Sequence, residues 1–291
     1  MLAVAEELEQ ALAGDGAVVA LETTLIAHGF PAGEGLEVGR ESDAAVRLAG
    51  ALPATVGVLD GALRVGLGDA ELDRFDSSAR KAGPNAIAAC IAEGVVGATT
   101  VGGTLVACRA AGIRVLATGG IGGVHRGWAG RPDVSADLGQ LARTRALVVC
   151  SGVKSLLDVP ATLEVLETLG VPVVGWRTDT LPLFYAAEGG PPLPSRVDTV
   201  AAAASLARAH WALGGAAVVL AQAPPASYDA EPLIAEALEA AEREGVTGAA
   251  VTPFVLSRLH EASGGRTLAV NRDLIVANAR LAGELAVELA R

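Results

Sequence analysis

Short apolar runs alternate with longer amphipathic segments along this chain of 291 residues. Runs rich in Val, Leu and Ala, bounded by Gly, Pro or polar residues, predict buried strands. Segments with apolar positions three and four residues apart predict helices. Regular alternation of the two predicts an α/β fold with a mainly parallel sheet. We find no internal repeat and no domain boundary, and therefore expect a single domain over residues 1–291.

The predicted elements can be given by residue range. The strands cover residues 17–21, 55–60, 63–67, 115–118, 146–150, 171–176 and 216–220. The helices cover residues 2–12, 33–48, 84–93, 103–111, 137–145, 160–169, 197–213, 231–244 and 274–289. The Asp60-Gly61 pair predicts the turn of a hairpin. The Gly- and Pro-rich residues 189–194 predict a surface linker or lid.

Composition narrows the functional classes. Hydrophobic residues make up 51% and charged residues 19%, which excludes disorder and predicts a large core. Aromatic residues are only 3%, so Val, Leu, Ile and Ala must build that core, as in a buried parallel sheet. A net charge of -11 argues against nucleic acid or a membrane surface as partner. A small anionic ligand held by local donors remains possible.

The expected compartment is the cytoplasm. Cys90, Cys108 and Cys150 are scattered without metal-type spacing and predict reduced thiols. No apolar run reaches the length of a membrane span. Acidic residues near the N-terminus are unlike the basic start of a signal peptide.

Two lysines stand out. Lys81 and Lys154 are the only lysines in a chain with 22 lysine and arginine residues. Unlike arginine, a lysine can become a neutral amine and form a Schiff base with a carbonyl group. Lys154 follows the apolar residues 146–150, and a low-dielectric neighbourhood there would lower its pKa. The alternative interpretation is a strand-end charge paired with Asp158.

Other polar residues also follow predicted strands, where α/β sheets bind ligands. Glu22 ends the first strand, and its carboxyl group is either a general acid with a raised pKa or a capping or salt-bridged acid. The glycines at 102–103 and 119–123 either let backbone amides approach a phosphate, together with Lys81 and Thr99 or Thr100, or simply form tight turns. His125 replaces the third glycine of a dinucleotide fingerprint, which disfavours a Rossmann cofactor site.

Asp133 and Asp137 lie four residues apart with Ser135 between them. Two carboxylates on one helical face are suitable oxygen ligands for Mg²⁺ or Mn²⁺. The alternative is an ordinary helix start, with Ser135 as N-cap and acidic residues near the positive end of the helix.

Several ordered segments together resemble the pseudouridine-5'-phosphate glycosidase family. The similarity covers nearly the whole chain and is most specific in residues 20–31, 118–127, 133–138, 149–155, 252–254 and 271–278. The resemblance implies a three-layer α/β/α sandwich that assembles as a homotrimer. It also implies an enzyme that makes or breaks a C–C glycosidic bond between C1' of ribose 5-phosphate and a carbon of an aromatic or pyrimidine partner.

The resemblance assigns roles to individual residues. Lys154 matches the lysine that captures C1' of the opened sugar as a Schiff base, and Glu22 matches the proton donor. Asp137 would assist proton transfer, and Asp133 matches the aspartate that binds Mn²⁺ or another divalent cation. The expected substrate-binding residues are Lys81, Thr99, Thr100, Val101, Thr118, His125, Ser135, Ala136, Asn271 and Asn278.

Two segments depart from the family pattern. Residues 82–86, after Lys81, lack the family's usual basic run, and residues 222–224 replace an Asn-Pro pair. We therefore favour C-ribosylation of a non-uracil acceptor, as in natural-product biosynthesis, over reversible cleavage of pseudouridine 5'-phosphate to uracil and ribose 5-phosphate. An alternative of another class is a catalytically silent phosphosugar-binding protein. A class I aldolase-like lyase shares the lysine chemistry but not these motifs.

Overall fold

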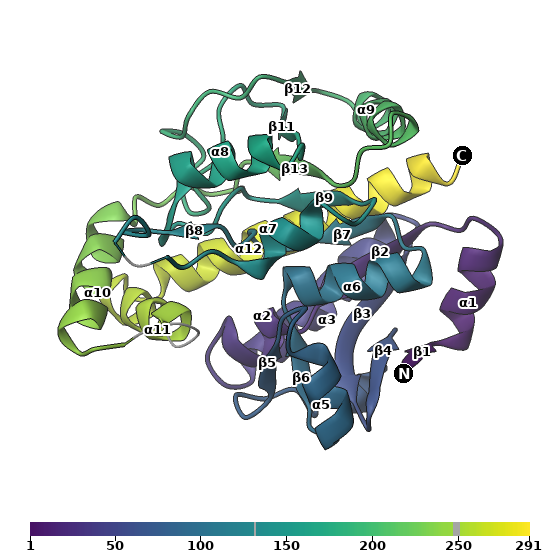
Figure 1. The fold of residues 1–291 in the computed structure, drawn as a ribbon, viewed down its shortest axis with the longest axis horizontal. Coiled ribbons are helices and arrows are strands. Elements are labelled where there is room, and N and C mark those ends of the chain that lie inside the picture. The colour runs from purple at the N-terminus through teal and green to yellow at the C-terminus, as the bar shows by residue number, and fades with distance from the viewer. Residues whose placement is uncertain (131, 247–250) are drawn as a thin grey trace.

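One mixed sheet runs through the molecule (Figure 1). The computed structural model describes residues 1–130, 132–246 and 251–291, without the side chains of residues 252 and 253. The strand order is β1 (Leu2–Val4), β4 (Ala62–Val65), β3 (Leu52–Leu59), β2 (Val18–Glu22), β7 (Val115–Ala117), β9 (Leu147–Cys150), β13 (Val218–Gln222), β11 (Val173–Trp176) and β12 (Arg196–Val197). Strands β5 (Arg80–Ala82) and β6 (Gly97–Thr99) join through β3, and β8 (Val124–His125) pairs separately with β10 (Leu157–Asp158).

Within the main sheet, β3 is antiparallel to β4 and β6, and the other pairings among the described residues are parallel. The predicted α/β fold with a mainly parallel sheet is therefore confirmed. The predicted hairpin is confirmed as well, because Leu59 pairs with Ala62 across a turn in which Asp60 and Gly61 have φ of 50° and 72°. Positive φ at both central residues is the signature of the tight turn that suits hairpins.

Helices cover both faces of the sheet. Val19 and Leu21 of β2 belong to one apolar cluster with Val46 and Leu285, whereas Ala20 belongs to a second cluster. The first face is covered by α3 (Glu34–Leu48), α9 (Val200–Ala212) and α12 (Arg266–Leu289). The second face is covered by α1 (Glu6–Ala13), α5 (Ile87–Glu93), α6 (Val101–Ala111), α7 (Ala136–Leu141) and α8 (Val159–Thr168). This alternation confirms the three-layer α/β/α arrangement.

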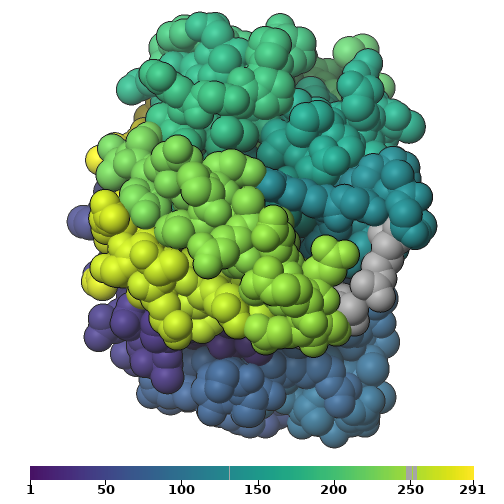
Figure 2. Space-filling model, turned by 90° about the vertical axis from the view of Figure 1, so that its left-hand side faces the viewer, coloured from purple at the N-terminus to yellow at the C-terminus, as the bar shows by residue number. Residues whose placement is uncertain are grey.

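Further helices lie outside these layers. They are α2 (Thr24–His28), α4 (Asp69–Leu72), α10 (Glu231–Arg243) and α11 (Val251–Ala262). Helices α10 and α11 pack on each other beside the start of α12, and they occupy the middle of the face shown in Figure 2. Among the described residues, no helix combines the length and the apolar character needed to cross a membrane.

Several boundaries differ from the predictions. The predicted helix over residues 2–12 begins only at Glu6, because Leu2–Val4 pair with β4 as an edge strand. The predicted helix over residues 274–289 begins eight residues earlier, at Arg266, and α7 ends at Leu141 rather than at residue 145. Helices α2 and α11 were not predicted, because their short or mixed sequences show no clear apolar stripe.

Residues 189–194, which were predicted to be a surface linker or lid, bind back on the preceding segment. The backbone N–H of Leu181 donates to the carbonyl of Pro191 at 2.9 Å, and that of Leu193 donates to the carbonyl of Asp179 at 2.9 Å. The segment thus folds back on residues 179–181 as an irregular hairpin. The predicted reduced thiols are confirmed, since all three cysteines are free and buried.

A carboxyl group away from the sheet ends gives a testable pH dependence. Burial raises the pKa of Asp43 from 3.8 to about 6, although Thr55 donates a hydrogen bond to it at 2.9 Å. The folded state therefore binds more protons than the unfolded state between about pH 4 and 6, and stability falls as pH rises through that window. We expect Asp43→Asn to raise the free energy of unfolding at pH 7.5 by about 1–3 kcal/mol.

Urea unfolding of both proteins at pH 4, 5, 6 and 7.5 measures this effect. The variant should lose the decline in stability between about pH 4 and 6, because it has no carboxyl group to ionise at this site. Equal slopes of stability against pH in the two proteins would contradict the assignment to Asp43.

Candidate active site

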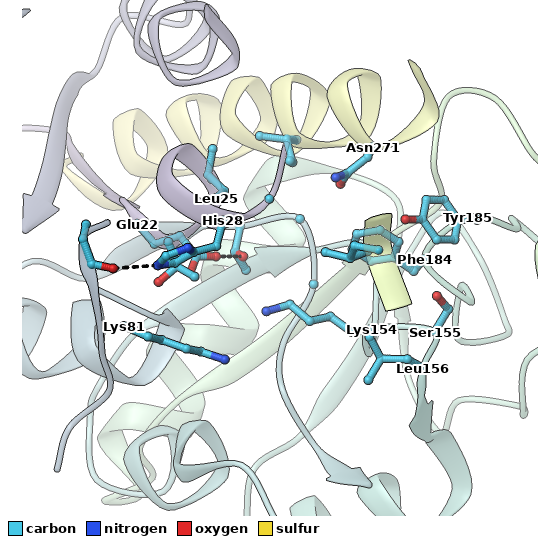
Figure 3. A pocket seen from close by; sticks show the side chains of 18 residues that line it. Glu22, Leu25, His28, Lys81, Lys154, Ser155, Leu156, Phe184, Tyr185 and Asn271 are labelled. Carbon is cyan, nitrogen blue, oxygen red and sulfur yellow. Dashed lines mark hydrogen bonds between the residues drawn. The ribbon is translucent and has the colours of Figure 1, made fainter. Parts of the chain in front are cut away.

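A cavity of about 190 Å³ lies where the carboxyl ends of β2, β7 and β9 meet, and α2, α11 and α12 contribute to its walls. Five predicted site residues line it: Glu22, Lys81, Thr118, Lys154 and Asn271. Figure 3 shows the side chains of Lys81 and Lys154 extending toward the same part of the cavity, near Glu22. The expected convergence of strand ends is therefore observed.

Glu22 is the last residue of β2, a central strand that is buried along its whole length. Its side chain is 4% exposed and accepts a hydrogen bond from the hydroxyl of Thr118, which follows β7. Burial raises the pKa of Glu22, while the positive charge of Lys154 and the hydrogen bond from Thr118 oppose the rise. A carboxyl group with a raised pKa in a cavity is suited to donate and accept protons near neutral pH.

Lys154 is positioned by two loops that bind each other. After β9, the backbone N–H of Lys154 donates to the carbonyl of Ile121 at 3.1 Å, and that of Ile121 donates to the carbonyl of Gly152 at 3.1 Å. Gly152 has φ of +86°, and a Cβ atom there would lie 2.2 Å from the carbonyl oxygen of Pro182. The loop therefore requires glycine at this position, and the requirement fixes where the lysine stem leaves the backbone.

The alternative interpretation of Lys154 is not supported by the contacts. Asp158 caps α8 by accepting a hydrogen bond from the backbone N–H of Ala161 at 3.0 Å. No ion pair joins Lys154 to Asp158 or to another acidic side chain within 4.0 Å in the part of the chain that the structure describes.

Lys81 lies on β5 and supplies a second amine to the cavity. It is solvent-accessible, yet local burial of its ammonium group and the positive charge of Lys154 lower its pKa. The carboxylates of Asp137, Glu22 and Asp133 act in the opposite direction. The Lys81 ammonium group therefore lies within electrostatic reach of the predicted catalytic and metal-binding residues.

Asp137 does not line the cavity but holds its surroundings together. One carboxylate oxygen accepts from the backbone N–H of Gly102 at 2.7 Å, and the other accepts from that of Gly122 at 2.9 Å. Ser135 is the N-cap of α7 and accepts from the backbone N–H of Asp137, as the helix-start interpretation predicts. Asp137 thus ties the start of α6 to the glycine-rich residues 119–123, which follow β7. Its role in proton transfer stays a prediction.

Gly122 makes this arrangement testable. A Cβ atom at Gly122 would lie 2.3 Å from Ser135 Oγ and 2.6 Å from Asp137 Oδ2. We expect Gly122→Ala to displace the loop, reduce kcat/KM by about 100-fold and lower the free energy of unfolding by about 1–3 kcal/mol. Gly139→Ala is the matched control, because its Cβ would meet no described atom within 4 Å inside α7.

The control should keep full activity and gain about 0.5–1 kcal/mol of stability, because alanine favours the helix. Steady-state kinetics and urea unfolding measure both effects. Equal activity of the two glycine variants would show that the loop tolerates displacement.

The remaining predicted binding residues fall into two groups. Thr99, Val101 and Asn278 are completely buried, and their contacts are internal. The hydroxyl of Thr99 donates to the carbonyl of Val56 at 2.6 Å, and the amide of Asn278 donates to the carbonyl of Thr118 at 2.9 Å. These side chains hold the strand ends in place, and they do not line the cavity described here.

The second group lies at the start of α6, around the start of α7 and on β8. Thr100 caps α6 by accepting from the backbone N–H of Gly103, and Ala136 is exposed on the first turn of α7. His125 Nδ1 lies 3.9 Å from Asp133 Oδ2, and the Asp133 side chain is 42% exposed. Both residues are partly open to solvent, unlike Thr99 and Asn278.

Other residues of the cavity wall were not predicted. His28 from α2 is within hydrogen-bonding distance of the Ala79 carbonyl, with Nε2 at 3.0 Å, and burial lowers its pKa. Phe184 and Tyr185 bring an aromatic pair to the opposite side. The chain has only four Phe and two Tyr, so adjacent aromatic residues beside a Gly- and Pro-rich segment were an available signal.

The chain is similar to known proteins over nearly its whole length. The family described as indigoidine synthase A-like protein matches residues 7–288. A protein of Solibacter usitatus named pseudouridine-5'-phosphate glycosidase is 44% identical over 296 residues, which covers 99% of each chain.

Two solved structures are similar over the whole chain. The prealnumycin C-glycosynthase in complex with ribulose 5-phosphate has a TM-score of 0.90 and 42% identity, covering 100% of this chain and 97% of the other. An indigoidine synthase A-like protein of Thermotoga maritima also has a TM-score of 0.90, with 37% identity and the same coverage.

Proposed function

Because this chain belongs to the indigoidine synthase A-like family, which here includes pseudouridine-5'-phosphate glycosidases, we propose that it makes or breaks a C–C glycosidic bond to ribose 5-phosphate. The bond joins C1' of the sugar to a carbon of a heteroaromatic partner. The observation that carries the proposal is that Lys154 and Glu22 line the same cavity. Lys154 supplies an amine, and Glu22 supplies a carboxyl group whose pKa is raised by burial. Covalent capture of a sugar needs the amine, and exchange of a proton at carbon needs the carboxyl group.

In the synthetic direction, the proposed reaction proceeds through an imine between Lys154 and the sugar. The Lys154 amine adds to the C1 aldehyde of the opened sugar, and water leaves as the imine forms. A nucleophilic carbon of the partner attacks C1, and Glu22 accepts the proton that this carbon loses. The oxygen of the sugar 4-hydroxyl then bonds to C1 while the bond between C1 and the Lys154 nitrogen breaks, and the hydroxyl proton leaves with the lysine amine. Cleavage follows the same steps in reverse.

In this proposal, Lys81 and the neighbouring loops hold the phosphate. Lys81 contributes a positive charge, and the glycine-rich residues 119–123 bring backbone close to the cavity. The solved structure with ribulose 5-phosphate, at 42% identity, supports a pentose phosphate as ligand.

The names of the relatives favour one partner. Pseudouridine-5'-phosphate glycosidases at 44–45% identity support uracil as the aglycone, and we take this as the working substrate. The similarity to a C-glycosynthase supports a second candidate, C-ribosylation of another acceptor in natural-product biosynthesis. Release of uracil from pseudouridine 5'-phosphate separates the two.

The region of Asp133 offers a divalent cation one carboxylate ligand. No three acidic, His or Cys side chains gather to hold a metal ion within the described ranges. The half-exposed Asp133 carboxylate suits a cation completed by water and substrate oxygens, which Mn²⁺ and Mg²⁺ accept. When bound there, the ion would offset phosphate charge.

We expect Asp133→Ala to weaken Mn²⁺ binding by about tenfold or more, because the substitution removes the carboxylate ligand. Calorimetric titration of the metal into the protein with ribose 5-phosphate measures the effect without turnover. An unchanged affinity would place the ion elsewhere.

The decisive experiment traps the covalent adduct. The enzyme is incubated with ribose 5-phosphate, reduced with borohydride and digested for mass spectrometry. A reduced pentose phosphate on Lys154 supports the proposal. An active enzyme without that adduct contradicts it, and tight sugar binding without adduct or turnover supports the catalytically silent binding protein instead.

A further inference from the structure

Two buried polar atoms on the cavity wall lack a hydrogen-bond partner. Among the described residues, four such side-chain atoms are found: Tyr185 Oη, Asn271 Oδ1 and the Nε2 atoms of His210 and His260. Of these four, the atoms of Tyr185 and Asn271 belong to residues that line the cavity. An unpaired buried donor or acceptor is unfavourable, so two of them on one ligand-sized cavity indicate a polar ligand edge.

The Tyr185 hydroxyl is not needed for the packing of its ring. Tyr185 is 1% exposed, and its ring meets that of Phe184 edge to face, with centroids 4.8 Å apart and an interplanar angle of 84°. Phenylalanine would preserve this contact. Burial raises the pKa of Tyr185, so its hydroxyl stays protonated and can donate a hydrogen bond.

The backbone holds the aromatic pair in an unfavourable conformation. Phe184 has φ of +64°, which non-glycine residues rarely adopt, and its N–H donates to the carbonyl of Ser151 at 3.1 Å. A Cβ atom at Gly120 would lie 2.7 Å from Phe184 Cδ2, so the ring needs glycine beneath it. Backbone strain of this kind is maintained where the surroundings fix a residue for function.

The same segment is joined to α12, which carries Asn271. The backbone N–H of Tyr228 donates to the carbonyl of Tyr185 at 2.8 Å. The guanidinium group of Arg266, the first residue of α12, lies 4.8 Å from the centre of the Tyr228 ring. Figure 3 shows Asn271, Phe184 and Tyr185 at the end of the cavity away from Lys81.

We propose that Tyr185 is a specificity-determining residue whose hydroxyl donates a hydrogen bond to a carbonyl oxygen of the aglycone, while Asn271 Oδ1 accepts from the adjacent imide N–H, which lies between the two ring carbonyl groups. The inference rests on the proposed function: with the sugar phosphate near Lys81 and Lys154, the aglycone lies toward the aromatic end of the cavity. A cyclic imide such as a pyrimidinedione presents a carbonyl group beside an N–H. A ring without N–H would leave the Asn271 acceptor unpaired, so the site selects the imide class.

Tyr185→Phe tests the inference, with Tyr228→Phe as matched control because it removes the chain's other tyrosine hydroxyl, outside the cavity wall. In synthesis from ribose 5-phosphate and uracil, Tyr185→Phe should raise the KM for uracil by about tenfold. The control should stay within about twofold of wild type. Borohydride trapping of the sugar on Lys154 should be equal in all three proteins. With 3-methyluracil, which lacks the imide N–H, wild type should lose activity, and Asn271→Leu should discriminate less against it.

Each outcome has a distinct meaning. Normal trapping with an unchanged KM for uracil in Tyr185→Phe overturns the role of the hydroxyl alone. Normal trapping without any reaction of wild type with uracil overturns the imide class. Failure of wild type to trap sugar on Lys154 overturns the proposed function and the inference together.

Discussion

Replacing Lys154 with arginine is expected to abolish turnover while the protein stays folded. Arginine keeps the positive charge and most of the side-chain length, but its guanidinium group cannot lose a proton and form an imine. We expect kcat to fall by about 10⁴-fold or more, the range seen when a covalent nucleophile is removed. Steady-state assays together with borohydride trapping measure both the turnover and the adduct.

Lys81→Arg is the matched control, because Lys81 is the chain's other lysine and lines the same cavity. Its proposed task needs only a positive charge near the phosphate, so the variant should keep trapping at Lys154 and lose about tenfold in kcat/KM. A Lys154→Arg protein with substantial activity, or an adduct that moves to Lys81, would contradict the assignment of the nucleophile.

The central part of the fold could be predicted because its strands are buried on both faces. Such strands leave continuous apolar runs, as residues 147–150 and 218–221 show. Short edge strands leave no such run. Arg80–Ala82 has only three residues, of which the first two are exposed and the third is buried. Its position depends on pairing with β6, a contact that no local pattern encodes.

The start of α12 was missed for a reason connected to the site. The missed part, residues 266–273, contains Asn271, which is polar and interrupts the apolar stripe, although it is buried. Asn278 faces inward because its amide donates to the Thr118 carbonyl and to Ser151 Oγ, which belong to the two loops around Lys154. The inward-facing amide of Asn271 therefore hid the first turns of α12, and both buried amides lie at or next to the site.

Part of the site was accessible from the sequence and part was not. Glu22 is the last residue of one apolar strand and Lys154 lies shortly after another, so the rule that ligands bind at strand ends was sufficient to find them. Tyr185 lies in an irregular segment that distant residues hold through backbone hydrogen bonds to Ser151 and Tyr228. Long-range contacts of this kind have no local sequence pattern, and the structure was needed to place the aromatic pair.

Glu22→Gln is expected to separate capture of the sugar from chemistry at the partner's carbon. The amide can still accept the hydrogen bond from Thr118, but it cannot donate or accept the transferred proton. We expect trapping at Lys154 to persist while kcat falls by about 10²- to 10⁴-fold. Because burial raises the pKa of Glu22, removing its charge should not lower the stability at neutral pH.

The pH profile gives this prediction its sharpest test. In the cleavage direction the protonated carboxyl group delivers the proton, so wild-type kcat should fall as pH rises through the raised pKa of Glu22. The residual activity of Glu22→Gln should lack that limb. Uracil released by wild type in D₂O should carry deuterium at the carbon that was bonded to the sugar. A variant that fails to trap sugar, or that keeps the wild-type pH limb, would show that another group transfers the proton.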